Sequence, residues 1–303
     1  MKLSNRFRGC IIGGAIGDAF GSGYEFQEKE EDSETFYLFG RPPDIEPEWK
    51  ITDDTQLTLT TCEFLTQDQT LNPEALALQL VENYKKGLVT NVGSSTLKAI
   101  RELEVGGHWS QVGRRGEYAA GNGAAMRIAP LAFKEGVTKE LIRDICSITH
   151  QNDEAYVGAY CVYQAIRLIV ENQWDESQDM RVVLIDCIQD TRIRDRLIEC
   201  VKQELSLSNL GEIGNDGYVV NTLPLVITAV NNLRTTDIKD IYKDLIQIGG
   251  DTDTNCSIFG QIAGAYLGYE GLPTDYRSKL ESLSSYDWIS RTIDKFIENE
   301  DWA

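Results

Sequence analysis

The chain has 303 residues, of which 42% are hydrophobic and 25% charged, a balance typical of a soluble globular protein. Its formal net charge of −19 argues against binding to a bare nucleic acid backbone, which requires lysine and arginine. No apolar run approaches the roughly 18 residues of a membrane span, the N-terminus lacks the pattern of a secretory signal, and the seven scattered cysteines contain no CxxC pair. We therefore expect a cytoplasmic protein with reduced thiols and no membrane contact.

The first predicted element is a helix over residues 5–23 with a stripe of glycines. These glycines recur at every fourth position: Gly9, Gly13, Gly17 and Gly21. Each glycine weakens a helix by about 1 kcal/mol relative to alanine, so the stripe predicts close approach of a neighbouring helix backbone. Gly260, Gly264 and Gly268 have the same spacing within the apolar run 258–267. We expect these two helices to cross in the core.

The rest of the chain also favours helices. Residues 28–50 are acidic, contain three prolines and lack periodicity, which predicts a long loop that is either a lid over a site or a plain surface excursion. Further helices are expected over residues 53–66, 73–86, 97–103, 128–135, 138–149, 153–171, 180–205, 218–232, 236–248, 274–283 and 286–299. With sparse strand signals and no clear linker, the sequence predicts one all-α domain spanning 1–303.

Two acidic clusters stand out, Thr52-Asp53-Asp54-Thr55 and Asp251-Thr252-Asp253-Thr254, and each opens an apolar helix. For one cluster alone, a capped helix start with solvated acids would be the preferred interpretation. Two matching clusters instead favour a shared metal site. Carboxylates with threonine hydroxyls form an oxygen-only ligand set that suits Mg²⁺, Mn²⁺ or Ca²⁺, and two histidines are too few for zinc.

Two smaller features are ambiguous on their own. The turn Gly121-Asn122-Gly123 could expose amides to a phosphate, although such turns more often simply precede a helix. His150 ends a predicted helix, and its position alone favours a C-terminal cap.

Taken in order along the chain, these motifs resemble the ADP-ribosylglycohydrolases of the dinitrogenase-reductase-activating type. The resemblance extends nearly from end to end. It rests on Gly13-Gly14-Ala15-Ile16-Gly17-Asp18-Ala19 with Glu25, Thr52-Asp53-Asp54-Thr55, Gly121-Asn122-Gly123-Ala124-Ala125-Met126-Arg127, Thr149-His150, and Gly249-Gly250-Asp251-Thr252-Asp253-Thr254.

The resemblance implies a single compact, orthogonal all-α bundle with long active-site loops. It also implies two bound divalent cations, Mg²⁺ or Mn²⁺, and hydrolysis of an ADP-ribosyl bond, with ADP-ribose as the product. The implied metal ligands are Thr52, Asp53, Asp54, Asp251, Asp253 and Thr254. The implied ADP-ribose contacts are Gly121, Asn122, Gly123, Met126 and His150, and the candidate catalytic acids are Glu25, Asp54 and Asp251.

The attached group is less well defined. Relatives that cleave ADP-ribosyl-arginine often carry an acid where this chain has Asn91, and a guanidinium leaving group prefers a carboxylate partner. The leading hypothesis is removal of ADP-ribose from a protein side chain such as arginine. The alternatives are an ADP-ribose-binding or immunity protein that neutralises an ADP-ribosyltransferase, and a phosphoesterase that cleaves the diphosphate.

Overall fold

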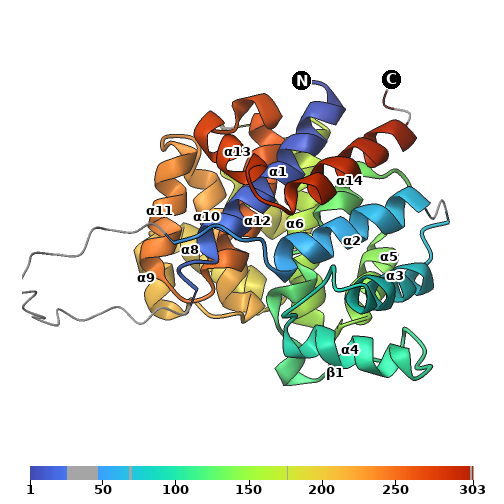
Figure 1. Cartoon of the computed structure of the whole chain (residues 1–303). Coiled ribbons are helices and arrows are strands. Elements are labelled where there is room, and N and C mark those ends of the chain that lie inside the picture. The colour runs from blue at the N-terminus through green and yellow to red at the C-terminus, as the bar shows by residue number, and fades with distance from the viewer. Residues whose placement is uncertain (26–46, 68–69, 176, 301, 303) are drawn as a thin grey trace, which may run out of the picture.

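The computed structural model describes residues 1–25, 47–67, 70–175, 177–300 and 302, and their regular structure is almost entirely helical (Figure 1). The all-α prediction is confirmed. The α-helices are α1 (Leu3–Gly21), α2 (Asp53–Gln67), α3 (Pro73–Lys85), α4 (Ser94–Glu104), α5 (Lys139–Ser147), α6 (Asp153–Val170), α7 (Met180–Cys187), α8 (Arg192–Gln203), α9 (Leu207–Ile213), α10 (Val219–Asn232), α11 (Ile238–Ile248), α12 (Thr252–Leu267), α13 (Thr274–Glu281) and α14 (Tyr286–Asn299). The short elements are 3-10 turns η1 (Glu117–Ala119), η2 (Asn122–Ala124), η3 (Ala129–Phe133) and η4 (Tyr269–Gly271), and strands β1 (Arg114–Arg115) and β2 (His150–Gln151), which pair in parallel.

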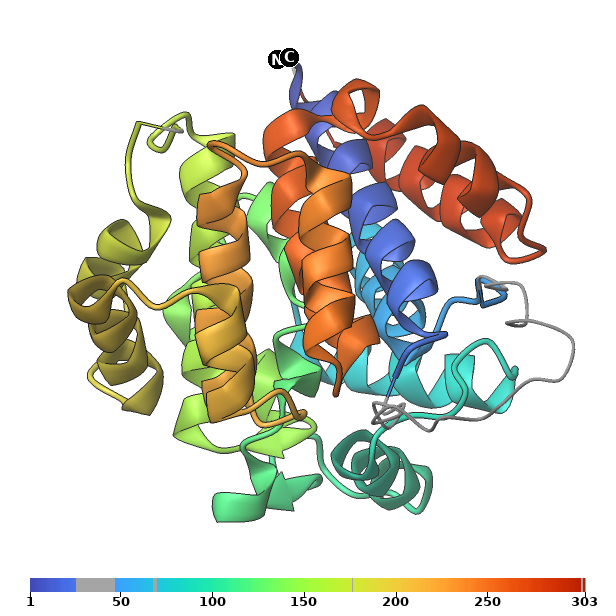
Figure 2. The ribbon, with the colours of Figure 1, turned by 90° about the vertical axis from the view of Figure 1, so that its left-hand side faces the viewer.

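Helices α1 and α12 lie side by side and antiparallel at the centre of the molecule (Figure 2). A Cβ atom added at Gly13 would lie 2.3 Å from the carbonyl oxygen of Gly260, and one at Gly9 would lie 2.3 Å from that of Gly264. Only glycine permits backbones to approach this closely. The predicted packing of the two glycine-rich helices is confirmed, and it places the end of α1 beside the start of α12.

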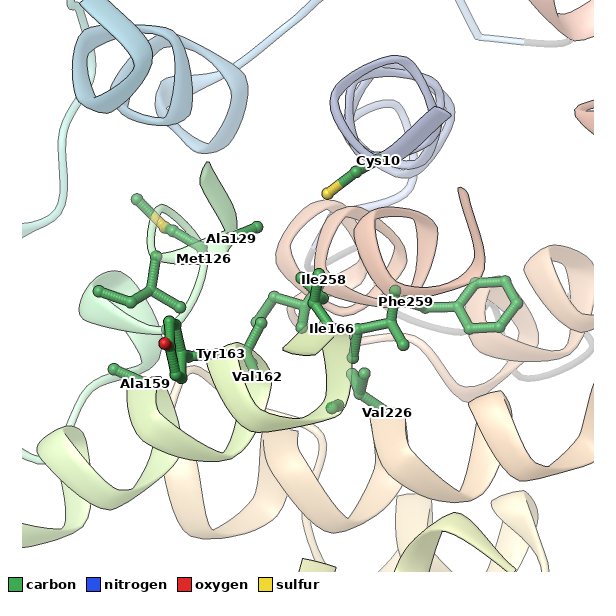
Figure 3. Close-up of a cluster of buried hydrophobic side chains, with 14 of the residues drawn as sticks. Cys10, Met126, Ala129, Ala159, Val162, Tyr163, Ile166, Val226, Ile258 and Phe259 are labelled. Atoms are coloured by element: carbon green, nitrogen blue, oxygen red, sulfur yellow. The ribbon is translucent and has the colours of Figure 1, made fainter. Parts of the chain in front are cut away.

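The apolar core continues from this helix pair into α6 and α10. Figure 3 shows Cys10 of α1 and Ile258 of α12 facing Ile166 of α6 and Val226 of α10, and all four are buried. In Figure 1, α8 to α11 lie on one side of the central pair and α2, α3 and α5 lie on the other. Among the helices of the described part of the chain, none has the length and apolar character needed to cross a membrane.

Some boundaries differ from the predictions. The helix expected over 180–205 is interrupted at Ile188, which has an extended backbone, and α8 begins only after Thr191. Residues 189–192 at this break are the polar run Gln-Asp-Thr-Arg, a local signal that the prediction did not use. The helix expected over 128–135 is the 3-10 turn η3, and α9 was not predicted although Ser206 and Asn209 form a capping box at its start.

Most of the predicted loop, residues 28–46, lies outside the described residues. Residues 47–50 are described, and Trp49 among them is part of the core packing. The Trp49 ring is buried, with its centroid 5.7 Å from that of Phe20, and the Lys50 carbonyl accepts a hydrogen bond from Ser22.

Candidate active site

Residues from distant parts of the chain line one cleft of about 350 Å³. It lies where the end of α1, the N-termini of α2, α4 and α12, the turn η2 and the strand β2 meet. All the predicted site residues except Thr52 line it, namely Glu25, Asp53, Asp54, Gly121, Asn122, Gly123, Met126, His150, Asp251, Asp253 and Thr254. The expectation that the fold brings the two acidic clusters together agrees with this geometry.

Asp18, near the end of α1, holds the first acidic cluster in place. Its carboxylate is fully buried and accepts hydrogen bonds from the backbone amides of Thr52 at 2.9 Å and Thr55 at 3.1 Å. It also accepts bonds from both of their hydroxyls. These interactions satisfy amides that the start of α2 would otherwise leave unpaired. Asp53 and Asp54 are therefore free from capping and face the cleft.

The second cluster is positioned by the loop before α12. Gly249 and Gly250 both have φ of +77°, and a Cβ atom at Gly250 would lie 2.2 Å from the carbonyl oxygen of Asn215. The same carbonyl oxygen accepts a 2.9 Å hydrogen bond from the backbone amide of Asp251. The Asp251 side chain makes no capping bond to α12; instead it accepts a 2.7 Å hydrogen bond from the Asn122 amide group. The simple capped-helix interpretation is wrong for this cluster.

The carboxylates form two overlapping groups. Oxygens of Asp18, Asp54 and Asp253 lie within 4.8 Å of one another, and so do oxygens of Glu25, Asp251 and Asp253. The Thr254 hydroxyl donates to Asp54 Oδ2 at 3.1 Å, whereas Asp54 Oδ1 is buried with no hydrogen-bond partner among the described residues. An unpartnered buried carboxylate oxygen among like charges fits a cation ligand.

Crowding and burial change the acidity of these groups. Burial raises the pKa of Asp53 to about 7 and, with repulsion from Asp251, that of Asp253 to about 9. Burial followed by the charge of Asp253 raises the pKa of Asp54 well above its usual range, and burial followed by the charge of Asp251 raises that of Glu25. Burial and mutual repulsion therefore favour the protonated forms of these acids when no cation is bound.

The other side of the cleft carries the glycine-flanked turn and His150. The Thr149 hydroxyl lies 2.7 Å from His150 Nδ1, and the opposite edge of the ring packs against Gly121 and Gly123. Burial and the charges of Arg127 and Arg114 lower the pKa of His150 to about 3, so the ring is neutral. His150 belongs to β2 and is not a C-terminal helix cap, which corrects the interpretation based on its position alone.

Three placements differ from the predictions. Thr52, a predicted metal ligand, does not line the cleft and directs its hydroxyl to Asp18 Oδ1 at 2.8 Å. Asp18 was not singled out, although an acid within a glycine-rich apolar helix was a usable signal. Arg114 lines the cleft because β1 pairs it with His150, a neighbour that local sequence does not reveal.

Comparison with known proteins agrees with this architecture. A sequence model of the ADP-ribosylglycohydrolase family matches residues 1–303. The chain is 26% identical to "ADP-ribosylhydrolase ARH3" of Gallus gallus, covering 95% of this chain and 92% of the relative. It is 27% identical to "ADP-ribosylarginine hydrolase Tri1" of Pseudomonas putida (strain GB-1), covering 91% and 74%. A solved "ADP-ribosylglycohydrolase-related protein complex" superposes with a TM-score of 0.69 at 23% identity over 99% of each chain.

The helical fold together with the family match and the named relatives identifies an all-α hydrolase. The chain belongs to the ADP-ribosylglycohydrolase family.

Proposed function

We propose that the protein removes ADP-ribose from ADP-ribosylated protein side chains in a reaction that depends on divalent cations. The observation that carries this proposal is the convergence of both acidic clusters, the Gly121–Gly123 turn and His150 on one cleft. The names of the two relatives, a hydrolase of ADP-ribose conjugates and an ADP-ribosylarginine hydrolase, support the same substrate class.

The residues present fit a metal centre. The donors are hard oxygens, Asp54 Oδ1 has no partner among the described residues, and the raised pKa values of the acids show that their charges need compensation. Asp54, Asp251, Asp253 and Thr254 would hold the ions, and Asp253 belongs to both carboxylate groups, which supports two ions sharing it. Mg²⁺ suits such a ligand set, and Mn²⁺ is the closest substitute. Bound cations would polarise the ribose hydroxyls and lower the pKa of a neighbouring water.

The two sides of the cleft then bind different parts of the ligand. The acidic side takes the ribose next to the scissile bond, and the side formed by Gly121, Gly123 and His150 takes the diphosphate. Arg114 adds positive charge to that second side in a protein whose net charge is −19. This separation would bring the anomeric carbon near Glu25, Asp53 and Asp251, which all line the cleft.

The bond to the side-chain nitrogen or oxygen breaks through an oxocarbenium-like state at the anomeric carbon. Water attacks that carbon as the bond to the leaving group breaks, and a carboxylate takes a proton from the water and passes it to the leaving group. We assign the proton to Glu25, which is exposed at the cleft and whose pKa is raised by burial and by Asp251. Asp54 and Asp251 would then orient the ribose and the water.

Arginine is the first acceptor to test. Asn91 lines the cleft without a charge, but Glu25 and Asp53 lie in the same cleft and offer carboxylates to a departing guanidine. Proteins ADP-ribosylated at arginine and at serine, incubated with Mg²⁺, would compare the two linkages.

The decisive experiment compares Asp253→Asn with the wild type and with Asp287→Asn, which alters an exposed acid on α14. We expect Asp253→Asn to abolish release and Asp287→Asn to leave it unchanged. Undiminished release by Asp253→Asn would contradict the metal assignment. Mass analysis of the products separates free ADP-ribose from AMP and ribose phosphate, and the second pair would indicate cleavage of the diphosphate. Binding of ADP-ribose without any turnover would favour a binding protein.

A further inference from the structure

Arg127 is a buried cation with no carboxylate partner among the described residues. Its side chain is 1% exposed, and one terminal nitrogen donates to the Ile145 carbonyl at 3.1 Å and to the Thr149 hydroxyl at 3.0 Å. The Nε and the second terminal nitrogen have no hydrogen-bond partner in the described part of the chain. Burial lowers the pKa of Arg127 to about 10, so it stays charged at neutral pH. A buried charge without a counter-charge destabilises the folded state, so the presence of Arg127 here indicates a role beyond packing.

The Thr149 hydroxyl links Arg127 to His150. A guanidinium has only donors, so the Thr149 oxygen accepts from Arg127. The same oxygen lies 2.7 Å from His150 Nδ1, and the described residues offer its hydrogen no other acceptor. If Nδ1 carried the ring proton, that buried hydroxyl hydrogen would be unpaired, at a cost of about 1–3 kcal/mol. The arrangement that satisfies all three groups has Thr149 donating to Nδ1.

A neutral imidazole has one N–H, so an accepting Nδ1 places the proton on Nε2. The Nε2 edge faces the glycine-flanked turn: a Cβ atom on Gly123 would lie 2.9 Å from Cε1 and 3.2 Å from Nε2, and one on Gly121 would lie 3.3 Å from Nε2. Among the described residues, Nε2 has no hydrogen-bond partner, and His150 lines the cleft. The two glycines therefore also leave room for the ring.

We propose that Arg127, acting through Thr149, fixes His150 in the form protonated at Nε2, so that the ring donates a hydrogen bond to an anionic phosphate oxygen in the cleft. Arg127 and Thr149 are positioning residues, and His150 is the contact. The opposite tautomer would direct a lone pair at the anion and repel it. The identity of the anion rests on the proposed function, whereas the tautomer does not depend on any ligand.

The tautomer can be measured directly because the chain has only two histidines, His108 and His150. Long-range ¹H–¹⁵N NMR of the ligand-free protein distinguishes a protonated ring nitrogen from an unprotonated one, and His108→Gln assigns the signals. We expect His150 to be protonated at Nε2 alone and to stay so from about pH 5 to 8, because its pKa is lowered. Protonation at Nδ1 in the wild type would overturn the proposal.

Variants test the two positioning residues. Thr149→Val removes the hydroxyl at nearly constant volume, and we expect the dissociation constant for ADP-ribose to rise about 10- to 100-fold, the range for a hydrogen bond to a charged group. Thr149→Ser should restore affinity. Arg127→Met should move the His150 pKa towards its ordinary value, because the Arg127 charge lowers it.

Thr61→Val is the matched control, since Thr61 is equally buried and its hydroxyl bonds only within α2. It should leave the histidine signals and the affinity unchanged. If Thr149→Val retained wild-type affinity and the Nε2–H form, the proposed positioning of His150 by Arg127 and Thr149 would be wrong. If the wild type had the Nε2–H form but bound no ADP-ribose, the proposed ligand would be contradicted, and the positioning of His150 would stand.

Discussion

The two buried acids Asp18 and Asp253 should respond to neutralisation with opposite signs. Asp18 accepts from the Thr52 and Thr55 amides and hydroxyls, so Asp18→Asn leaves at least one of these buried donors facing an amide NH₂ group. Each unsatisfied buried donor costs about 1–3 kcal/mol, which gives a loss of about 2–4 kcal/mol for the set. For a chain of 303 residues the melting temperature should fall by roughly 3–6 °C.

Asp253→Asn should instead stabilise the metal-free protein. The pKa of Asp253 is raised to about 9, first by burial and then by the charge of Asp251, so folding in EDTA at pH 8 requires this carboxyl group to take up a proton that it has released in the unfolded chain. An amide in its place removes the free-energy cost of that proton uptake. The same change removes a proposed metal ligand, so the stabilisation by Mg²⁺ should disappear.

The assay is thermal unfolding at pH 8, first in EDTA and then with excess Mg²⁺. We expect Asp18→Asn to melt below the wild type in both conditions. We expect Asp253→Asn to melt above the wild type in EDTA and to gain nothing from Mg²⁺. An Asp18→Asn protein as stable as the wild type would refute the assigned capping role. An Asp253→Asn protein that is destabilised in EDTA would refute the repulsion argument.

Three further predictions follow from the same geometry. Gly13→Ala should destabilise the protein by about 1–3 kcal/mol in denaturant unfolding, because the new Cβ atom would lie 2.3 Å from the Gly260 carbonyl oxygen. A gain in stability of roughly 1 kcal/mol, as helix propensity alone would give, would contradict the close packing. In EDTA the free energy of unfolding should fall as pH rises from about 4 to 9, because folded Asp53 and Asp253, with pKa values of about 7 and about 9, retain protons that the unfolded chain releases. Mg²⁺ at a hundred times its dissociation constant should add about 2.7 kcal/mol to the free energy of unfolding. A stability in EDTA that does not change with pH would count against the raised pKa values. Asn91→Asp should increase kcat/KM for ADP-ribosyl-arginine about tenfold, because it offers a carboxylate to the guanidinium. The kcat/KM for a serine-linked substrate, measured as the control, should not change. Equal effects on both substrates would refute a role of residue 91 in acceptor choice.

Helix positions followed from local patterns more reliably than helix ends did. The period of the apolar residues located α2, α6, α10 and α12 because each buries one or more faces in the core. The prediction ran a single helix through the break between α7 and α8, although the polar residues 189–192 lie there and Ile188 has an extended backbone.

The sequence by itself determined the chemistry of the site. Two clusters of oxygen donors, a glycine-flanked turn and one histidine were visible as residues, and their order indicated the family. The glycine stripes even indicated which helices meet, because only a close backbone contact compensates for four glycines in one helix.

Only the tertiary structure decided how these groups act. It assigned the α2 amides to Asp18 and so left Asp53 and Asp54 free for the cleft. It also brought Arg114 beside His150 and placed Thr149 between that ring and Arg127. Hydrogen-bond partners, burial and the pKa shifts that follow depend on distances between residues far apart in the chain, and no local pattern of side chains encodes those distances.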